Sequence, residues 1–383
     1  MKILRLARFL PPKVGGLEYH VEELSRHQAR MGHELALFFE QGEAIAMSRL
    51  TCVKVAASPA TRYAASDLLR GAFFSMRSSS VLGGPEYCRD AYDLVHSHGD
   101  IGEIVGAVRM AKKLGCPLVH TVHGGLSRQK HYRFLASRIF QFPDLILAVS
   151  ENIKDDLCTL GVDAGRVKVF SSGVDCERIQ AADPAAEARA IENLRLVGDI
   201  TPVIVITVGR LHPVKGMHYF VTAAKKLLKQ WPQVRFVIVG EGSERSTLES
   251  MIDGDPRIIL TGQKDKDEIY AMLRLSSVYV ITSVDLPNQY EGTPTSLLEG
   301  MVASLSVVAT DTGGVSRLVG DGKGGFIVQQ HSVEQIVESI SRLLGDRGLA
   351  IEMGEHNRRI ASSFDWKLQA EKITLAYEKI VRL

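Results

Sequence analysis

A chain of 383 residues, of which 45% are apolar, is long enough to bury two hydrophobic cores, so two domains are expected. The 46 lysines and arginines nearly balance the 44 acidic residues, and the resulting formal charge of +2 argues against nucleic acid as a partner. The five cysteines are scattered and form no C-x-x-C pair. Neither a disulfide framework nor a zinc site is therefore expected, and the predicted location is the cytoplasm.

The amino terminus, "MKILRLARFLPP", predicts a first strand rather than a signal peptide, because Arg5 and Arg8 interrupt its apolar run. No apolar stretch in the sequence approaches the ~20 residues that a membrane-spanning helix requires. We therefore expect a protein that is soluble or that lies on the inner surface of a membrane.

The first half of the chain predicts a parallel sheet that is covered on both faces. Apolar runs without alternation recur in "KILRLA", "HELALFF", "TCVKVAA", "DLVHSH", "PLVHTVH", "DLILAVS" and "RVKVF". Helical patterns separate these runs; one of them places Val21, Leu24 and Met31 at helical spacing and ends at Gly32, a residue typical of C-caps. The alternation predicts a doubly wound α/β domain over residues 1–180.

Residues 61–77, "TRYAASDLLRGAFFSMR", predict an amphipathic helix that also carries Arg62, Arg70 and Arg77. Its apolar side chains at helical spacing are Leu68, Leu69, Ala72, Phe73 and Met76. Such a segment can lie in the interface of an anionic bilayer, although the more frequent alternative is an ordinary helix packed on the sheet.

The second half repeats the alternation of strand and helix. Residues 180–201 are rich in alanine and charge and are interpreted as the connection between the domains. Strand-like runs follow in "PVIVITV", "VRFVIV", "RIILTG", "VYVITS", "LSVVATD" and "GFIVQQ". They predict a second doubly wound domain over residues 181–365, followed by a final helix over 366–383. Ligands of such sheets lie beyond the carboxyl ends of the strands.

Glycine turns follow several predicted strands. Gly15 and Gly16 stand directly before a helix, where free backbone N–H groups favour an anion; alternatively they form a tight turn. In "ITVGRLHPVKG", Arg210 and Lys215 could straddle a diphosphate, or be two solvated charges. In "VIVGEGSERSTL" the third glycine position of a dinucleotide fingerprint holds Arg245, so this turn is interpreted as part of a nucleotide-binding half without NAD.

The stretch "YEGTPTSLLEG" holds Glu291 and Glu299 eight positions apart. Thr293 is the predicted N-cap and Pro294 the first helical residue, so Glu291 lies in a loop and Glu299 on the second turn of a helix. The carboxylate of Glu299 could accept hydrogen bonds from two ribose hydroxyls, while the amides after Gly292 face a phosphate and Glu291 reaches a sugar. The alternative is a capping loop with two surface acids.

Taken in order, "PPKVGG", "HTVHGG", "SSGVD", "VGRLHPVKG", "VGEGS", "YEGTPTSLLEG" and "TDTGGV" resemble the retaining glycosyltransferases of family four over nearly the whole chain. The resemblance implies the GT-B fold, in which two doubly wound, Rossmann-like α/β domains face a central cleft. It also implies that the domain over 1–180 binds the acceptor, that the domain over 181–365 binds the nucleotide-sugar, and that the final helix over 366–383 packs back on the first domain. The region from about 60 to 90 matches no motif of the family, and we expect it to select the acceptor, because loops carry specificity. Two positions depart from the family pattern: Ser172 stands where asparagine is usual before G-V-D, and Arg317 stands where glutamate usually follows the Gly-Gly turn.

The resemblance also implies roles for individual residues. Arg210 and Lys215 would bind the donor diphosphate and Glu299 the ribose, whereas Glu291 and His123 would contact the donor sugar. The predicted catalytic residues are therefore Glu291, His123, Arg210 and Lys215. The full set predicted to bind the donor is Gly15, Gly16, Arg210, Lys215, Gly240, Gly292, Thr293, Pro294, Thr295 and Glu299.

Two further histidines and one acidic pair need interpretation. His96 and His98 in "VHSHGD" are candidates for contact with the acceptor, and His96 is equally interpreted as a core histidine. Asp265 and Asp267 have the spacing of a metal-binding Asp-x-Asp pair, but they open a predicted helix, where acidic residues are favoured in any case. No metal site is predicted.

We therefore expect a metal-independent, retaining hexosyltransferase of polysaccharide biosynthesis, in which protein cations and amides stabilise the departing nucleotide diphosphate. The expected donor is a UDP-sugar, with a GDP-sugar as the alternative, and it is a co-substrate, so no cofactor is expected. The acceptor would be a glycan, a lipid-linked precursor or a small molecule. Two rival functions share the architecture: a nucleotide-sugar 2-epimerase, which would need no acceptor, and a non-catalytic nucleotide-sugar binding protein, which would lack Glu291 or His123.

Overall fold

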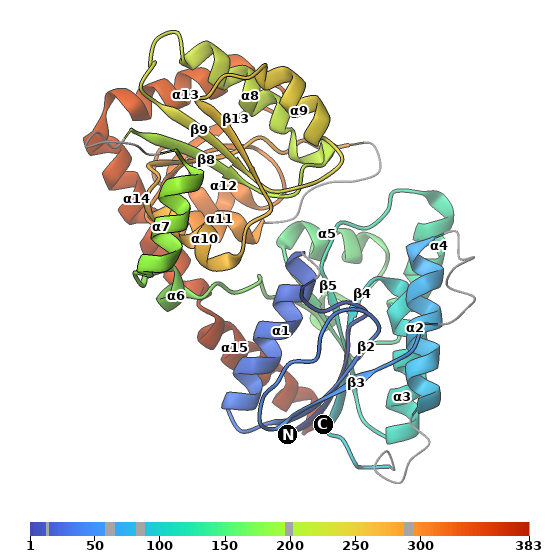
Figure 1. Ribbon diagram of the computed structural model, residues 1–383. Helices are drawn as coiled ribbons and strands as arrows, with labels where there is room; N and C mark the ends of the chain where they lie inside the picture. The colour runs from blue at the N-terminus through green and yellow to red at the C-terminus, as the bar shows by residue number, and fades with distance from the viewer. Residues whose placement is uncertain (13–14, 58–65, 82–88, 196–201, 287–293, 383) are drawn as a thin grey trace. The chain divides into compact units, whose positions relative to one another are not determined.

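The computed structural model describes all residues except 13–14, 58–65, 82–88, 196–201, 287–293 and 383 (Figure 1). It divides into two compact units. The first comprises Met1–Gly173 together with Trp366–Leu383, and the second comprises Val174–Asp365.

The first unit is built on a seven-stranded parallel sheet with the strand order β3-β2-β1-β4-β5-β6-β7. Its strands are β1 (Lys2–Leu6), β2 (Glu34–Phe39), β3 (Leu50–Lys54), β4 (Leu94–Gly99), β5 (Leu118–Val122), β6 (Leu145–Ala148) and β7 (Val167–Val169). These are the seven strands predicted from apolar runs. The order reverses between β1 and β4, which makes the carboxyl ends of these two strands the expected place for a ligand.

Helices cover both faces of this sheet, as the doubly wound prediction requires (Figure 1). They are α1 (Gly16–Arg30), α2 (Asp67–Val81), α3 (Ile101–Leu114), α4 (Lys130–Ile139), α5 (Glu151–Thr159) and α15 (Trp366–Val381). On one face α15 packs against α1, and the rings of Trp366 and Tyr377 are buried there. On the other face α3 begins at a capping box formed by Asp100 and Glu103 and ends at Gly115 in the left-handed conformation.

The second unit contains a six-stranded parallel sheet with the order β10-β9-β8-β11-β12-β13. Its strands are β8 (Ile204–Val208), β9 (Arg235–Val239), β10 (Ile258–Gly262), β11 (Val278–Ile281), β12 (Ser306–Thr310) and β13 (Gly325–Val328). Its helices are α6 (Cys176–Gln180), α7 (Pro184–Asn193), α8 (Met217–Leu227), α9 (Arg245–Ile252), α10 (Lys266–Arg274), α11 (Thr295–Val302), α12 (Val315–Val319), α13 (Val333–Gly345) and α14 (Arg347–Ala361). Hydrophobic side chains fill both faces of this sheet, so the second unit is also doubly wound.

The interpretation of residues 180–201 as a simple connection is wrong for most of its length. Asp183 caps α7 through hydrogen bonds to the first turn, and Ala186 and Ala190 are fully buried against the second unit. The alanines that suggested a linker provide a narrow helix face, which lets α7 pack on α10.

Candidate functional site

The loop that follows β8 is held in place by the loop that follows β9. The amide of Leu211 donates to the carbonyl of Glu241 (2.9 Å), and the amide of Glu244 donates back to the carbonyl of Leu211 (3.0 Å). Gly240 has a φ of +148°, and a Cβ there would overlap the carbonyl oxygen of Gly209. The glycine that resembled part of a dinucleotide fingerprint is therefore required for packing of two loops.

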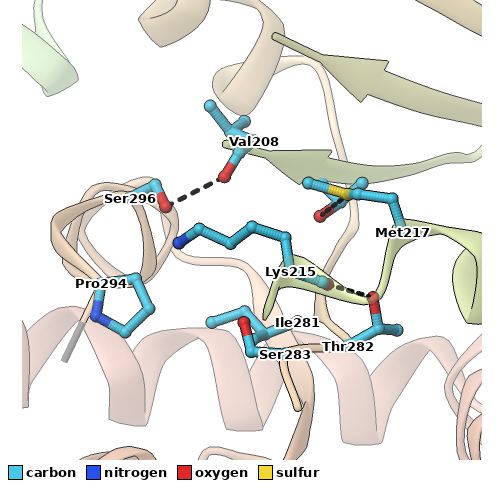
Figure 2. A pocket seen from close by; sticks show the side chains of 9 residues that line it. Val208, Lys215, Met217, Ile281, Thr282, Ser283, Pro294 and Ser296 are labelled. Carbon is cyan, nitrogen blue, oxygen red and sulfur yellow. Dashed lines mark hydrogen bonds between the residues drawn. The ribbon is translucent and has the colours of Figure 1, made fainter. Parts of the chain in front are cut away.

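Lys215 is positioned by a short 3-10 turn, η4 (Pro213–Lys215). Its backbone carbonyl accepts a hydrogen bond from Thr282 Oγ1 (3.0 Å), and the carbonyl of Val214 accepts one from the amide of Val284 (2.8 Å). The end of β11 thus fixes the backbone that carries the lysine. In Figure 2 the ammonium end of Lys215 points toward the first turn of α11.

Lys215 lines a small pocket at the carboxyl ends of β8 and β11 (Figure 2). The lining residues are Thr207, Val208, Lys215, Met217, Ile281, Thr282, Ser283, Pro294 and Ser296. The pocket combines a cation, two serine hydroxyls and the start of a helix, where backbone N–H groups lack intrahelical partners. This is a suitable environment for a phosphate group.

The start of α11 differs by one residue from the prediction. Pro294 is in an extended conformation (φ −66°, ψ 130°) at the N-cap position, and Thr295 is the first helical residue. The amide of Leu297 donates to the carbonyl of Pro294 (3.1 Å), and Ser296 Oγ donates to the carbonyl of Val208 at the end of β8 (3.1 Å). Proline fits here because the N-cap does not need its own N–H for the helix.

Glu299 lies on the second turn of α11, as predicted, and its side chain is only 2% exposed. It forms an ion pair with Lys266 at the start of α10. Lys266 could not be predicted from the sequence, because the two residues belong to different helices and no local pattern relates them. A carboxylate that already has one cationic partner keeps a fixed position from which it can accept hydrogen bonds.

Three predicted donor residues, Glu291, Gly292 and Thr293, lie outside the described residues. Arg210 is exposed on the loop after β8. The described part of the second unit therefore brings together Lys215 and the start of α11 at one pocket, with Glu299 further along the same helix.

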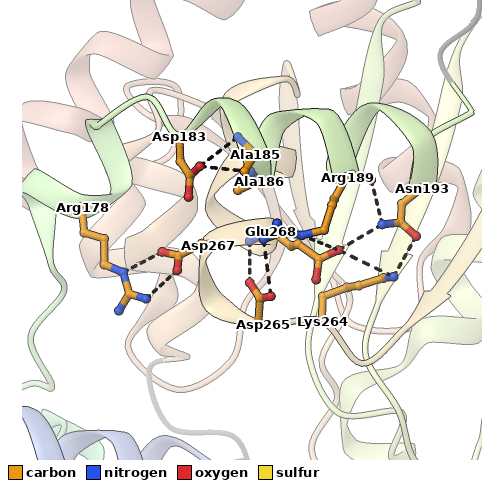
Figure 3. Close-up of polar contacts among 10 residues, drawn as sticks. All are labelled: Arg178, Asp183, Ala185, Ala186, Arg189, Asn193, Lys264, Asp265, Asp267 and Glu268. Carbon is orange, nitrogen blue, oxygen red and sulfur yellow. Dashed lines mark hydrogen bonds and ion pairs between the residues drawn. The ribbon is translucent and has the colours of Figure 1, made fainter.

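The acidic pair Asp265 and Asp267 takes part in structural contacts (Figure 3). Asp265 caps α10 by accepting a hydrogen bond from the amide of Glu268 (2.8 Å). Asp267 accepts a forked pair of hydrogen bonds from Arg178 (2.7 and 2.9 Å), and these lower the pKa of its carboxyl group. Asp265 therefore caps a helix and Asp267 forms an ion pair, although the two have the spacing of a metal-binding pair.

In the first unit, α1 begins at Gly16, with Gly15 at the N-cap position and no side-chain cap. A Cβ on Gly15 would overlap the carboxylate of Glu18, which folds back on the first turn of the helix. Because the carboxylate end of a flexible side chain can move aside, local packing does not require glycine at position 15, and a contact of these amides with phosphate stays a prediction.

His96 occupies the core. Its Nε2 is hydrogen-bonded to Thr121 Oγ1 and its Nδ1 to the hydroxyl of Tyr377, both at 2.7 Å, and the residue is fully buried. Of the two interpretations held open for His96, the structure favours the core histidine over the acceptor contact, because both ring nitrogens are engaged inside the unit.

His98 and His123 lie beside each other at the ends of β4 and β5. Nδ1 of His98 is 3.0 Å from Nε2 of His123. A third imidazole, that of His20 on α1, packs edge-on against His123 with 4.7 Å between ring centroids. Nδ1 of His20 is hydrogen-bonded to Ser172 Oγ (3.0 Å), so the serine that departs from the family pattern orients this ring.

Burial keeps these imidazoles neutral. It lowers the pKa of His123 to about 3, and it holds the pKa values of His20 and His98 well below the ordinary value. A neutral imidazole can accept a hydrogen bond or bind a metal at neutral pH.

Two family models match the chain. Residues 14–178 match the family model described as Glycosyltransferase Family 4, and residues 195–360 match that of Glycosyl transferases group 1. The chain belongs to the family-four glycosyltransferases.

This glycosyltransferase has curated relatives of related activity. It is 27% identical over 310 residues to the UDP-Gal:alpha-D-GlcNAc-diphosphoundecaprenol alpha-1,3-galactosyltransferase of Escherichia coli, covering 76% of this chain and 77% of the relative. It is 26% identical over 394 residues to the D-inositol 3-phosphate glycosyltransferase of Kribbella flavida, covering 95% of this chain and 90% of the relative. Together with the family models, these relatives support a nucleotide-sugar-dependent glycosyltransferase.

The predicted GT-B fold is confirmed by solved structures. HepE of Anabaena, solved in complex with UDP, superposes with a TM-score of 0.79 at 20% identity, over 99% of this glycosyltransferase and 100% of HepE. Sucrose-phosphate synthase of Thermosynechococcus elongatus gives a TM-score of 0.82 at 19% identity, over 99% and 98% of the two chains.

Proposed function

We propose that this glycosyltransferase transfers a hexosyl group from a UDP-sugar to a lipid-linked or free glycan, with retention of anomeric configuration and without a metal ion. The observation that carries the proposal is the pocket in which Lys215 and the start of α11 converge. A diphosphate bound there would meet an ammonium group and helix amides, and Glu299, further along the same helix, would accept hydrogen bonds from the ribose.

In the proposed reaction, the bond between the anomeric carbon and the diphosphate oxygen breaks, and its electron pair leaves with the nucleotide. The acceptor hydroxyl forms the new bond on the same face of the sugar and passes its proton to an oxygen of the departing diphosphate. Lys215 and Arg210 would stabilise the charge on the departing diphosphate, which costs little reorganisation because the Lys215 loop is already fixed. Glu291 and His123 would orient the donor sugar.

The choice of UDP is supported by two of the similar proteins, since HepE was solved with UDP and the Escherichia coli relative is named for a UDP-sugar donor. That relative also acts on a diphosphoundecaprenol-linked sugar, which supports a lipid-linked acceptor. The decisive experiment incubates the protein with UDP-, GDP- and ADP-sugars and a lipid-diphosphate glycan, and determines the product and its anomeric configuration by NMR. Nucleotide release without acceptor would indicate an epimerase, and an inverted product would contradict retention.

Transfer should persist in excess EDTA. The physical reason is that Lys215, Arg210 and the first turn of α11 would supply the positive charge that a metal ion supplies in other transferases. Initial rates with and without EDTA should agree within experimental error. Loss of transfer in EDTA that added manganese or magnesium restores would contradict metal independence.

We also propose that α2 contacts anionic membranes. α2 packs on α3 and buries Phe74, as an ordinary packed helix does. The proposed membrane contact is supported by Leu69, Phe73 and Met76, which are 45%, 38% and 39% exposed. Arg77 is exposed on the same helix. Residues 61–65 of the predicted segment lie outside the described residues, and no helix in the described part of the chain is long and apolar enough to cross a membrane.

The protein should float with liposomes that contain phosphatidylglycerol at low salt, and binding should weaken as salt increases. Phe73→Ser should weaken binding about tenfold or more, because burial of a phenylalanine side chain contributes about 1.5–3 kcal/mol. Ile351→Ser, which changes a residue that is 53% exposed on α14, is the matched control and should bind normally. Absence of flotation at low salt would contradict the membrane contact. Phe74→Ser is unsuitable as a test, because Phe74 is 1% exposed and belongs to the core.

A further inference from the structure

Three imidazoles from three separate elements meet in the first unit. His20 lies on α1, His98 near the end of β4, and His123 directly after β5. Each offers one ring nitrogen, and the three nitrogens lie within 4.8 Å of one another. The ring centroids of His20 and His98 are 5.7 Å apart, and those of His98 and His123 are 5.3 Å apart.

Two nitrogen atoms of this cluster have no hydrogen-bond partner among the described residues. They are Nε2 of His20 and Nε2 of His98, and both residues are only 1% exposed. Buried polar atoms are satisfied in nearly all native proteins, so these two nitrogens need a partner that the described residues do not supply, such as an ion or a water molecule. His123 is partly exposed, which leaves the cluster accessible from one side.

The chemistry of the donor atoms selects the ligand. The cluster offers imidazoles and no carboxylate, a donor set that suits zinc, nickel, cobalt or copper and not magnesium or calcium. Ser172 Oγ is hydrogen-bonded to Nδ1 of His20, which leaves Nε2 of that ring for the cluster. Such a partner for the second ring nitrogen is typical of metal-binding histidines.

The positive charge of Arg5 opposes the binding of a cation at this histidine cluster. The buried guanidinium of Arg5 acts electrostatically on His20 and His98, although its own N–H groups are directed to Ser25 and Gln28 (2.6 and 2.5 Å). We therefore expect reversible binding rather than a permanently occupied structural site.

We propose that His20, His98 and His123 bind one divalent transition-metal ion, Zn²⁺ being the natural candidate, and that this ion inhibits transfer by occupying His123. The binding is independent of the proposed function, whereas the inhibition rests on the proposed role of His123 at the donor sugar. The two parts are therefore tested by separate measurements.

Binding is tested with full-length protein that carries no histidine tag and has been treated with chelator. Titration with Co²⁺ should give one cobalt per chain and visible d–d absorption of a nitrogen-coordinated ion, and Zn²⁺ should displace it. His20→Gln and His98→Asn should weaken cobalt binding at least tenfold, whereas His131→Gln, at an exposed position on α4, is the matched control and should bind normally. Ser172→Ala keeps all three ligands and should weaken binding to a smaller extent.

The cobalt spectrum of the wild-type protein tests the proposed metal site even where a variant fails to fold. No d–d absorption at stoichiometric cobalt, or a thiolate charge-transfer band that indicates cysteine ligands, would overturn the site.

Inhibition is tested by initial transfer rates. Stoichiometric Zn²⁺ should abolish most of the activity, EDTA should restore it, and His20→Gln should need at least tenfold more Zn²⁺ for the same inhibition. Full activity with cobalt demonstrably bound would overturn the proposed inhibition and the assignment of His123 to the donor sugar. It would not affect the proposed diphosphate site at Lys215.

Discussion

Replacement of Lys215 by alanine should lower kcat/KM for the donor by about 10- to 150-fold, which corresponds to loss of one charge-assisted contact of ~1.5–3 kcal/mol. Lys215 projects into a pocket whose other wall is the start of α11, so its ammonium is held where a diphosphate would bind. Arg210→Ala should lower the same quantity at least tenfold, because a guanidinium can bind the diphosphate with a forked contact.

The matched control is Lys225→Ala, which removes an exposed lysine from α8 in the same unit. It changes the net charge equally and should leave donor kinetics unchanged. Lys215→Arg keeps the charge but enlarges the side chain in a small pocket, so it should restore part of the loss. Unchanged donor kinetics in Lys215→Ala would refute the pocket as the diphosphate site, and an equal loss in Lys225→Ala would show that net charge alone matters.

The strands of both sheets could be predicted from the sequence because a parallel strand covered on both faces must be apolar throughout, as "IVITV" in β8 is. The start of α10 was also predictable, because aspartate is a residue type favoured at the N-cap and Asp265 occupies that position. The error at α7 arose because alanine-rich, charged segments occur both in linkers and in helices with a narrow buried face, and only the packing on α10 distinguishes them.

The parts of the candidate site that sequence reasoning missed are all contacts between distant segments. His20 and Ser172 are 152 positions apart, and Lys266 and Glu299 are 33 positions apart on different helices. Nothing in a local window indicates that one face of α1 meets the ends of β4 and β5. A helical-face analysis of α1 would have shown His20 beside Leu24, on the buried side, and this was the only available signal.

Acidification should destabilise the first unit. Burial lowers the pKa of His20, His96, His98, His120 and His123, and it lowers those of His120 and His123 to about 3. Below about pH 6.5 the unfolded chain binds protons at these residues and the folded chain does not, so stability falls as the pH falls. Between pH 7 and pH 5, His120 and His123 should each account for a loss of about 2 kcal/mol.

One buried group in the same unit acts in the opposite direction. Desolvation raises the pKa of Glu103 to about 8, so the folded chain keeps a proton that the unfolded chain releases above about pH 4.5. The contribution of Glu103 to the free energy of unfolding is therefore present at low pH and is lost as the pH rises toward 8. It offsets part of the effect of the histidines, and Glu103→Gln should make the loss of stability on acidification steeper.

The measurement is hydrogen exchange at pH 7, 6 and 5, corrected for the intrinsic exchange rate, because two units need not unfold in one step. Protection of β4 and β5 should fall with the pH, whereas β8 and β11 of the second unit provide the internal control. In that unit burial lowers the pKa of His218, whose side chain is partly exposed. Equal loss of protection in both units, or a flat profile in Glu103→Gln, would show that the buried imidazoles do not control the acid stability of the first sheet.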